Sequence, residues 1–497
     1  MIAILAVVVG GLYAAPQLLI RHAVQEQGRS FVLSQFTYLH DGGDAYLQFA
    51  REVVDGHFPP SDLFFDYKMP NIFPPLSSLM MAGMIFLFKD INIAYIAANF
   101  LFSSISFLLF FLFGWVVFNR DKLWSIFVGL VGTLTPIAIL LPYAFFSIDN
   151  LSNIVLKNFY PGVETFLPTL FMARIEYPLI THLIYLPAII AFFVFWRRPK
   201  PATAIVAGLL SGLLFYTYFH KWVYWVVVVG VAFLYTLVFR RQDRRRLAGL
   251  IAMIGTMILV SVPYFINYFQ LKNLAGANDY INRLHLELGR SFNWSAGPDY
   301  AAYLLLGTLV YLVFWKKREF KDRAVLYWIF LVAAFLVWNI QIVIGFVPHS
   351  DHWPRAVSPL IFLIVSDLIY STSKRLESHR PNFRAVLTVF IIVLSVLLVA
   401  KKVVNAIGFI PPAPMVLKDY TFPESAVSSW RWLDLNFDEP KVVSPSFISS
   451  IYLSAFTSAR PYLPWGAITP LSNYELEELF LRSNKVFGVD QAVLEKR

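Results

Sequence analysis

The sequence predicts an all-α polytopic membrane protein. Of its 497 residues, 58% are hydrophobic and only 14% are charged, whereas soluble globular proteins carry about 25% charged residues. Its hydrophobic residues also form continuous runs, each close to the roughly 17–25 residues that a helix needs to cross a bilayer. Because lipid offers the backbone no hydrogen-bond partner, such runs predict transmembrane helices.

Twelve runs of this kind follow one another along the chain. We therefore expect about 11–12 transmembrane helices. The first run lacks a charged leading segment and a clear small-residue cleavage site, so we interpret it as a retained span. The runs lie near residues 2–20, 71–88, 91–118, 123–145, 179–196, 202–219, 222–239, 247–267, 299–315, 324–347, 356–372 and 384–401.

The net charge of +10 does not indicate nucleic-acid binding. Lys and Arg concentrate in short clusters between the hydrophobic runs, at 197–200, 240–246, 316–323 and 374–384. This distribution is typical of cytoplasmic loops, so the intervening loops and the chain after 402 should face outward. The absence of cysteine excludes disulfides and thiolate metal sites.

The first quarter of the chain contains one hydrophobic run too many for this topology. An odd number of crossings must separate an outward first loop from the cytoplasmic turn at 120–122, yet two runs lie there. We favour 71–88 as an irregular or interfacial segment, because Pro70, Pro74 and Pro75 disrupt its start. The alternative is a break within 91–118.

We expect two domains. Residues 1–401 form the transmembrane domain, with a long first outer loop at 21–70. Residues 402–497 form a small extracytoplasmic α/β domain after a proline-rich linker. Within this second domain we expect strands at 441–443 and 450–456 and an amphipathic helix at 473–487.

The first outer loop contains the strongest candidate for chemistry. Asp41 and Asp44 flank two glycines, and an amphipathic segment with Tyr46 and Phe49 on one face follows them. Carboxylates grouped at a membrane boundary can act on a substrate. The alternative is a solvated turn whose aspartates cap the following helix.

Later outer loops add basic residues at the mouths of spans. Arg174 precedes a span that contains His182, and Arg174 can either bind substrate or extend to lipid headgroups. The loop at 349–355 contains two histidines, an acid and Arg355. Its arginine could hold phosphate oxygens, with a histidine adding a hydrogen bond. A metal site and a plain interfacial loop are the alternatives there, and the aromatic hairpin at 216–222 is typical of an interface belt.

Taken in chain order, these motifs resemble the GT-C superfamily of integral-membrane glycosyltransferases. The superfamily includes protein mannosyltransferases, aminoarabinose transferases and oligosaccharyltransferases. The resemblance covers about residues 1–400 and rests on the acidic motif after the first span and on three later motifs. The family usually has an adjacent acid pair, whereas here two glycines separate the acids. The motifs are Asp41 to Tyr46, Pro74-Pro75-Leu76, Arg174 to Pro178 and Arg355 to Pro359.

The resemblance implies transfer of a sugar from a polyprenyl-phosphate donor to a glycan, lipid or protein acceptor. The reaction would invert the anomeric centre on the outer side of the plasma membrane. A carboxylate would serve as general base, and cationic groups would stabilise the departing phosphate. The roles implied are base for Asp41 or Asp44, phosphate contacts for Arg174, His352 and Arg355, and a second acid, Asp149 or Glu176, if a divalent cation binds.

Two other classes of function remain open on the sequence. A transporter or flippase of a lipid-linked or anionic substrate should place ionisable groups near the middle of spans, whereas here they cluster at outer ends. An inactive scaffold protein would use the C-terminal domain to bind a partner.

Overall fold

A computed structural model describes most of the chain. The described residues are 1–33, 46–61, 70–135, 152, 158–159, 175–284, 286–315, 321–347, 352–407, 414–463 and 469–494.

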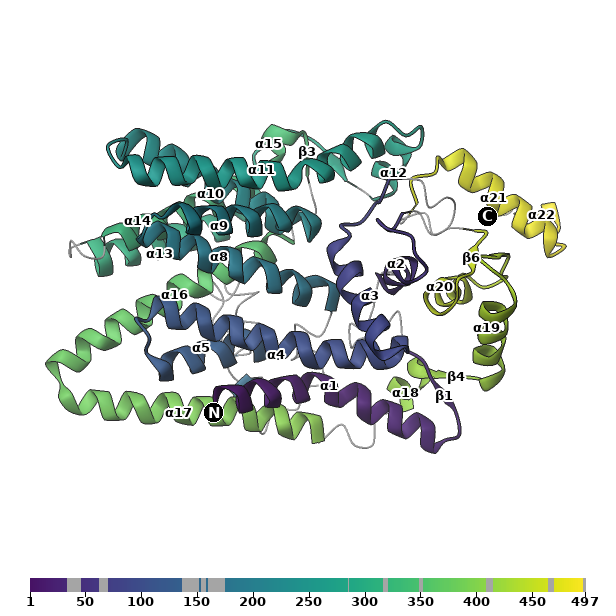
Figure 1. Ribbon diagram of the computed structural model, residues 1–497, viewed down its shortest axis with the longest axis horizontal. Coiled ribbons are helices and arrows are strands. Elements are labelled where there is room, and N and C mark those ends of the chain that lie inside the picture. The colour runs from purple at the N-terminus through teal and green to yellow at the C-terminus, as the bar shows by residue number, and fades with distance from the viewer. Residues whose placement is uncertain are drawn as a thin grey trace. The chain divides into compact units, whose positions relative to one another are not determined.

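Eight helices in the described part of the chain are long and apolar enough to cross a membrane (Figure 1). The predicted all-α polytopic fold is therefore confirmed. In chain order the spans are Ile2–Glu26 (α1), Ile91–Val117 (α4), Pro178–Arg197 (α8 with the end of η3), Phe219–Phe239 (α10), Arg244–Lys272 (α11), Trp294–Trp315 (η5, α13 and η6), Trp353–His379 (α16) and Asn382–Ala406 (within α17).

Shorter helices account for the other predicted runs. They are α3 (Leu76–Phe88), α5 (Lys122–Leu134), α9 with η4 (Pro201–Tyr216) and α14 (Lys321–Val337). The run predicted at 324–347 is too long, because α14 ends at Val337. In the turn that follows, Asn339 Oδ1 accepts a hydrogen bond from the Asn293 backbone amide at 2.9 Å, and the chain continues as α15 (Gln341–Ile344) and β3 (Phe346–Val347).

The irregular segment of the first quarter is α3. Helix α4 is continuous over 27 residues, so the alternative of a break within 91–118 is wrong. Helix α3 has 13 residues, or about 20 Å of helix, against a hydrocarbon core of about 30 Å. The Leu33 amide just after α1 donates to Asn92 Oδ1 at the start of α4, at 2.9 Å. The end of α1 and the start of α4 therefore lie together, which fits a helix α3 that does not cross.

The chain divides into two compact units. One contains 1–16, 99–261 and 287–410, and the other contains 17–98, 262–286 and 411–497. The C-terminal segment thus packs with the first loop, whereas the sequence predicts a contiguous domain at 402–497. The further elements of the second unit are β1 (Ser30–Phe31), α2 (Tyr46–Val54), α12 (Ala277–Arg283), α18 (Pro414–Tyr420), β4 (Thr421–Phe422), α19 (Glu424–Asn436), β5 (Lys441–Val442), α20 (Phe447–Phe456), β6 (Arg460–Pro461), α21 (Asn473–Val486) and α22 (Gln491–Leu494).

The strand predicted at 450–456 is wrong, because this segment forms helix α20. The helix begins after Ser446, whose hydroxyl accepts a hydrogen bond from the Ser449 amide at 3.3 Å, as an N-cap does. The predicted helix at 473–487 is confirmed as α21, which opens with a capping box between Ser472 and Glu475. Strand β5 is present at 441–442 and pairs in parallel with β6.

The hydrophobic core of the second unit brings α19 and α20 against the chain after α1. Val32, Trp430, Tyr452 and Leu453 form its buried centre. Strands β1 and β4 pair antiparallel beside it, with Ser30 opposite Phe422. These contacts join segments almost 400 residues apart in sequence.

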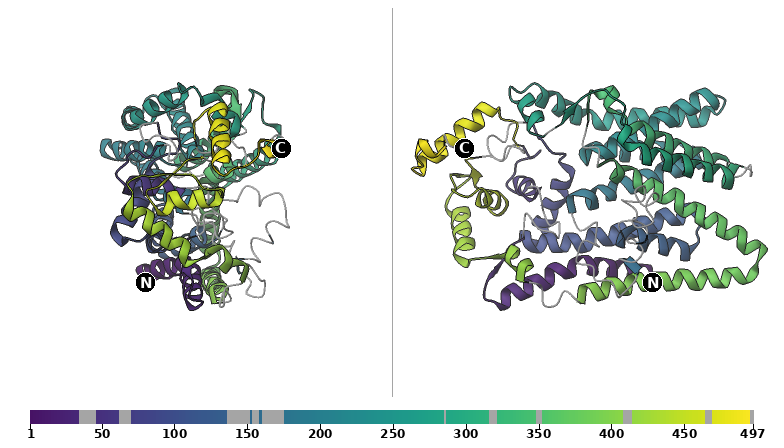
Figure 2. Two further views of the ribbon diagram at one scale, coloured as in Figure 1. Left: turned by 90° about the vertical axis from the view of Figure 1, so that its right-hand side faces the viewer. Right: turned by 180° about the vertical axis from the view of Figure 1, so that it is seen from behind.

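Two glycines on α9 allow helices of the first unit to pack closely. A Cβ atom added at Gly208 would lie 2.6 Å from the Met253 carbonyl oxygen, and one at Gly212 would lie 2.5 Å from Val260 Cβ. Small residues spaced four apart permit such close packing between membrane helices. Elsewhere in this unit α17 (Pro381–Ile407) runs beside α5 (Figures 1 and 2).

A buried ion pair links α14 to α16 in the first unit. Arg323 Nη1 donates to both carboxylate oxygens of Asp367 at 3.1 and 3.0 Å, and the Tyr327 hydroxyl donates at 2.5 Å. Asp367 is fully buried. Because these bonds satisfy the carboxylate within the protein, the pair is structural.

We expect Asp367→Ala to lower the free energy of unfolding by about 3–5 kcal/mol, because the Arg323 charge would remain buried and unpaired. Thermal unfolding of the purified protein in detergent measures the change. Glu478→Ala, which removes a solvent-exposed pair with Arg482, is the matched control and should leave the melting temperature unchanged. Equal melting temperatures for the two variants would contradict the structural role of Asp367.

Candidate functional site

The first unit gathers basic and aromatic side chains where the first turns of three helices meet. The helices are α8 (Thr181–Arg197), α10 and α16. Lys221 and His182 are buried, with 1% and 0% of their surface exposed. The cluster therefore places a basic side chain inside the protein, at the end of membrane-spanning helices.

Lys221 Nζ lies 3.4 Å from Nδ1 and 3.2 Å from Nε2 of His182, and only one of these nitrogens can accept a hydrogen bond. His182 Nδ1 lies 2.8 Å from the Pro178 carbonyl oxygen, which can only accept, so Nδ1 carries the proton. The Nε2 atom is then free to accept a hydrogen bond from Lys221 Nζ, 3.2 Å away. Tyr185 provides its ring to the Lys221 ammonium at 5.4 Å and donates its hydroxyl proton to the Ala356 carbonyl oxygen.

His352 and Arg355 lie at the start of α16, beside the same cluster. The Tyr218 hydroxyl forms a short hydrogen bond with His352 Nδ1. The His220 ring packs edge-on against Trp353, with 4.6 Å between ring centroids. Arg355 lies within electrostatic range of Lys221, and the His352 ring lies 5.2 Å from the ring of His220, the neighbour of Lys221 in the chain. Two of the residues that the sequence predicts as phosphate contacts are therefore near a buried lysine.

The first turns of α10 and α16 carry charges of the wrong sign for their position. The N-terminus of a helix carries a partial positive charge and favours acidic residues. Here Lys221 is the third residue of α10, Arg355 is the third residue of α16, and neither first turn contains an acid. Two helix N-termini and two cations therefore add their positive potential in one region, which is suited to binding an anion.

Within the part of the chain that the structure describes, no carboxylate pairs with Lys221. A buried cation is costly unless a partner compensates it. The ammonium has three donors, and His182 accepts one. An anionic substrate group would bind the others and offset the burial.

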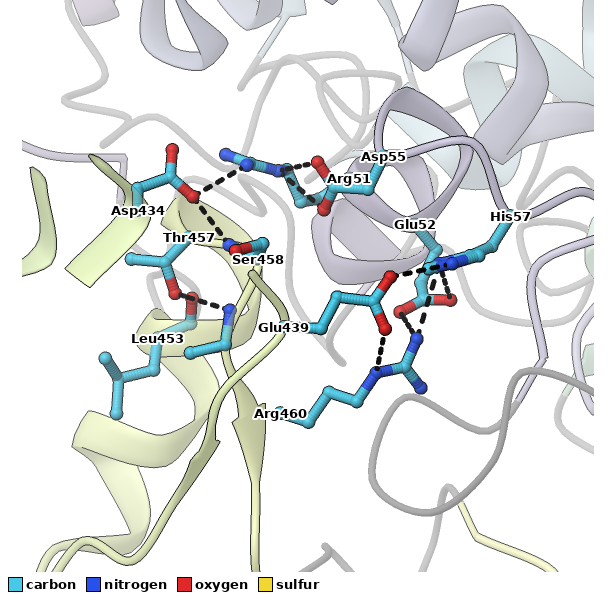
Figure 3. A network of polar contacts seen from close by, with 11 residues as sticks. Arg51, Glu52, Asp55, His57, Asp434, Glu439, Leu453, Thr457, Ser458 and Arg460 are labelled. Carbon is cyan, nitrogen blue, oxygen red and sulfur yellow. Dashed lines mark hydrogen bonds and ion pairs between the residues drawn. The ribbon is translucent and has the colours of Figure 1, made fainter. Parts of the chain in front are cut away.

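A second polar network surrounds α2 in the other unit (Figure 3). Arg460, 6% exposed, lies 3.5 Å from Glu52 Oε1 and 3.1 Å from Glu439 Oε2. The His57 ring lies between the same two acids, at 3.3 Å from Glu52 and 2.8 Å from Glu439. These contacts attach α2 to the C-terminal segment of the chain.

Arg51 forms a second connection from α2. Its Nε donates to both oxygens of Asp55, at 2.8 and 2.9 Å, and its Nη2 donates to Asp434 at 2.9 Å. Burial raises the pKa of the Asp55 carboxyl, although the Arg51 guanidinium acts in the opposite direction. Asp434 also accepts a hydrogen bond from the Ser458 amide. Helix α2, which directly follows the predicted acidic motif, is thus attached to the C-terminal segment through both Arg51 and Glu52 (Figure 3).

Several predicted site residues lie outside the described part of the chain. These are Asp41, Asp44, Asp149 and Arg174. The backbone of Glu176 lies in η3 (Ile175–Ile180), a π-helical turn that leads into α8, and its side chain also falls outside the description. The described residues contain no group of three His, Asp or Glu side chains that could hold a metal ion.

Lys221 and His220 do not stand out in the sequence as site residues. Aromatic residues dominate the hairpin at 216–222 and make it typical of an interface belt. The signal that could have identified the site is the lysine at the start of a span otherwise free of charge, after a histidine. His182 carried no signal of its own, because its role depends on the position of Lys221.

No protein-family model matches the chain, and no characterised protein matches it by sequence. Its structure is similar to that of the oligosaccharyltransferase of Archaeoglobus fulgidus, crystallised with Zn and sulfate, with a TM-score of 0.49 and 13% identity. That match covers 91% of this chain and 62% of the oligosaccharyltransferase, so this chain spans only part of that protein's length. The structure is also similar to that of ArnT of Cupriavidus metallidurans bound to undecaprenyl phosphate, with a TM-score of 0.47 and 13% identity. That match covers 90% of this chain and 84% of ArnT.

We expect Arg460→Ala to loosen α2, because the change leaves the Glu52 carboxylate buried without its guanidinium. Removing one partner of a buried pair costs about 3–5 kcal/mol. Hydrogen exchange of the α2 amides should accelerate, as measured by mass spectrometry of the full chain. Arg431→Ala, at a side chain that is 71% exposed, is the control and should leave the exchange unchanged. Unaltered exchange in Arg460→Ala would show that the network does not hold α2.

Proposed function

We propose that the protein is a GT-C-type membrane glycosyltransferase that takes a sugar from a polyprenyl-phosphate donor. The observation that carries the proposal is the buried Lys221 amine, which contacts His182 and lies within electrostatic range of Arg355, with no described carboxylate beside it. An anion would stabilise the charged form of such a group, and in a membrane-spanning protein a phosphate on a lipid chain can reach it. The multi-pass fold and the order of the sequence motifs support the same assignment.

In this proposal the cationic cluster binds the phosphate of the donor. Lys221 acts as a point charge and Arg355 supplies a planar fork that matches two phosphate oxygens. His352, oriented by the Tyr218 hydroxyl, adds a further hydrogen bond. These groups stabilise the negative charge that develops on the phosphate as the bond to the sugar breaks.

The acceptor hydroxyl attacks the anomeric carbon from the face opposite the phosphate. The new carbon–oxygen bond forms as the carbon–oxygen bond to the phosphate breaks, so the configuration inverts. The hydroxyl proton passes to a carboxylate, for which we propose Asp41 or Asp44. Arg174 is proposed as an additional phosphate contact. Asp149 or Glu176 is proposed as the second acid that would help to hold a divalent cation if one binds.

We place the site on the extracytoplasmic side of the plasma membrane. The loops at 216–222 and 349–355 alternate along the chain with the basic clusters, which are typical of cytoplasmic loops. The position of the charged residues along the helices also distinguishes a transferase from a transporter. Lys221 and Arg355 lie in the first turns of their helices, as expected for a site at the membrane boundary. The one buried charge near the middle of α16, Asp367, is bound by Arg323 and Tyr327.

Lys221→Met should weaken binding of undecaprenyl phosphate about tenfold to a hundredfold, since a hydrogen bond to a charged group contributes about 1.5–3 kcal/mol. Titration of the purified protein in detergent measures the affinity. The melting temperature should stay constant or rise, because an apolar side chain replaces a buried charge.

The control for this experiment is Lys402→Met, at another buried lysine whose Nζ donates to Asn158 Oδ1 at 2.9 Å. It should retain the affinity of the unmodified protein. An undiminished affinity in Lys221→Met would refute the assignment of the cluster to the lipid phosphate.

Asp41→Asn or Asp44→Asn should lower the rate of sugar transfer by about two to four orders of magnitude, the usual contribution of a general base. The donor is prepared from the lipid-linked sugars that accumulate in a deletion strain and are identified by mass spectrometry. The assay follows release of polyprenyl phosphate in proteoliposomes.

Asp66→Asn in the same outer loop is the control and should remain active. Full activity of both Asp41→Asn and Asp44→Asn, in protein that inserts normally, would refute the proposed base. Substrate flux across the vesicles without a covalent product would instead identify a transporter.

A further inference from the structure

A positively charged pocket lies in the second unit, at the ends of two membrane-spanning helices. Its volume is 630 Å³, within the range of about 300–1,000 Å³ that small-molecule sites occupy. Residues at the end of α1, at the end of α3 and at the start of α4 line it, together with residues of α2, α19 and α20. The elements around it are labelled in Figure 1.

The lining contains more cations than its own acids can neutralise. Five basic side chains face two acidic ones, an excess of three positive charges. The acids are already used: Asp90 Oδ1 accepts a hydrogen bond from the Ile93 amide, and Asp434 accepts bonds from Arg51 and Ser458. The basic residues of the lining are Arg21, Arg29, Arg51, Lys89 and Arg431.

Three of these cations are available to a ligand. Arg51 is bound to Asp55 and Asp434, and Arg431 lies 3.8 Å from Glu424. For Arg21, Arg29 and Lys89 the described residues provide no acidic partner. The topology does not explain these charges either, because basic residues are favoured in cytoplasmic loops and this pocket adjoins the outward first loop.

The position of the pocket identifies a lipid as the source of its anion. Arg21 and Lys89 lie at the ends of α1 and α3, where long basic side chains reach the level of the headgroups. The end of α3 is also apolar and uncovered: Phe86 is 49% exposed, and Leu87 is 71% exposed. A lipid can place its acyl chains along this helix end while its phosphate enters the pocket.

We infer that this pocket binds the phosphate headgroup of an anionic phospholipid. Arginine forks and a lysine ammonium are the groups that bind phosphate in proteins, and Trp430 and Phe456 give the pocket an apolar wall. The inference concerns a separate site from the Lys221 cluster and does not depend on the proposed transferase activity.

Native mass spectrometry of the full chain in detergent tests the inference, with phosphatidylglycerol and phosphatidylcholine as probes. The protein should bind one phosphatidylglycerol at least tenfold more tightly than phosphatidylcholine. Each basic residue near a headgroup contributes about fivefold to affinity. Arg21→Gln/Arg29→Gln/Lys89→Gln should therefore abolish the preference, and the milder Arg29→Gln alone should weaken binding about fivefold.

The control is Arg241→Gln/Arg244→Gln/Arg245→Gln, an equal change of charge at exposed positions outside the pocket, which should keep the preference. An equal loss in both triple variants, or none in the pocket variant or in Arg29→Gln, would overturn the inference. Displacement of phosphatidylglycerol by inorganic phosphate at the same concentration would overturn the choice of a lipid, because it would identify a soluble phosphate as the occupant.

Discussion

The proposed activity depends on one electrostatic constraint, the burial of the Lys221 ammonium among membrane-spanning helices. Water cannot solvate this charge, and within the described chain its compensation comes from a neutral histidine and an aromatic ring. Burying a charge in this manner costs desolvation free energy in the free protein, and pairing with a bound anion offsets that cost. Binding of the substrate phosphate would therefore restore an electrostatic balance that the fold leaves incomplete.

Other buried polar groups of the protein show the contrast. Asp367 receives hydrogen bonds from Arg323 and Tyr327, and the Trp225 indole donates to the Ser211 hydroxyl at 2.7 Å. Those groups are satisfied by neighbouring helices and hold the bundle together. In the second unit, Arg460 and Arg51 connect α2 to the C-terminal segment in the same way. That segment thereby supports the helix that follows the acidic motif.

The sequence is sufficient to predict the helices, because their signal is local. Continuous apolar runs identify every span, and prolines before α3 identify the irregular one. It is not sufficient at 450–456, where a short apolar run predicts a strand. A serine N-cap and the packing of Tyr452 against Trp430 favour the helix instead. His352 and Arg355 could be chosen from one short loop. The sequence could not predict that they lie near Lys221, because this depends on how α10 and α16 pack. His352 and Lys221 are 131 residues apart in the chain.

The most direct measurement is an experimental structure of the protein with a polyprenyl phosphate bound. We predict that phosphate oxygens lie within hydrogen-bond distance of Lys221 Nζ and of the Arg355 guanidinium, with the lipid chain between membrane helices. A phosphate bound elsewhere, with the Lys221 ammonium satisfied instead by a carboxylate of the protein, would contradict it.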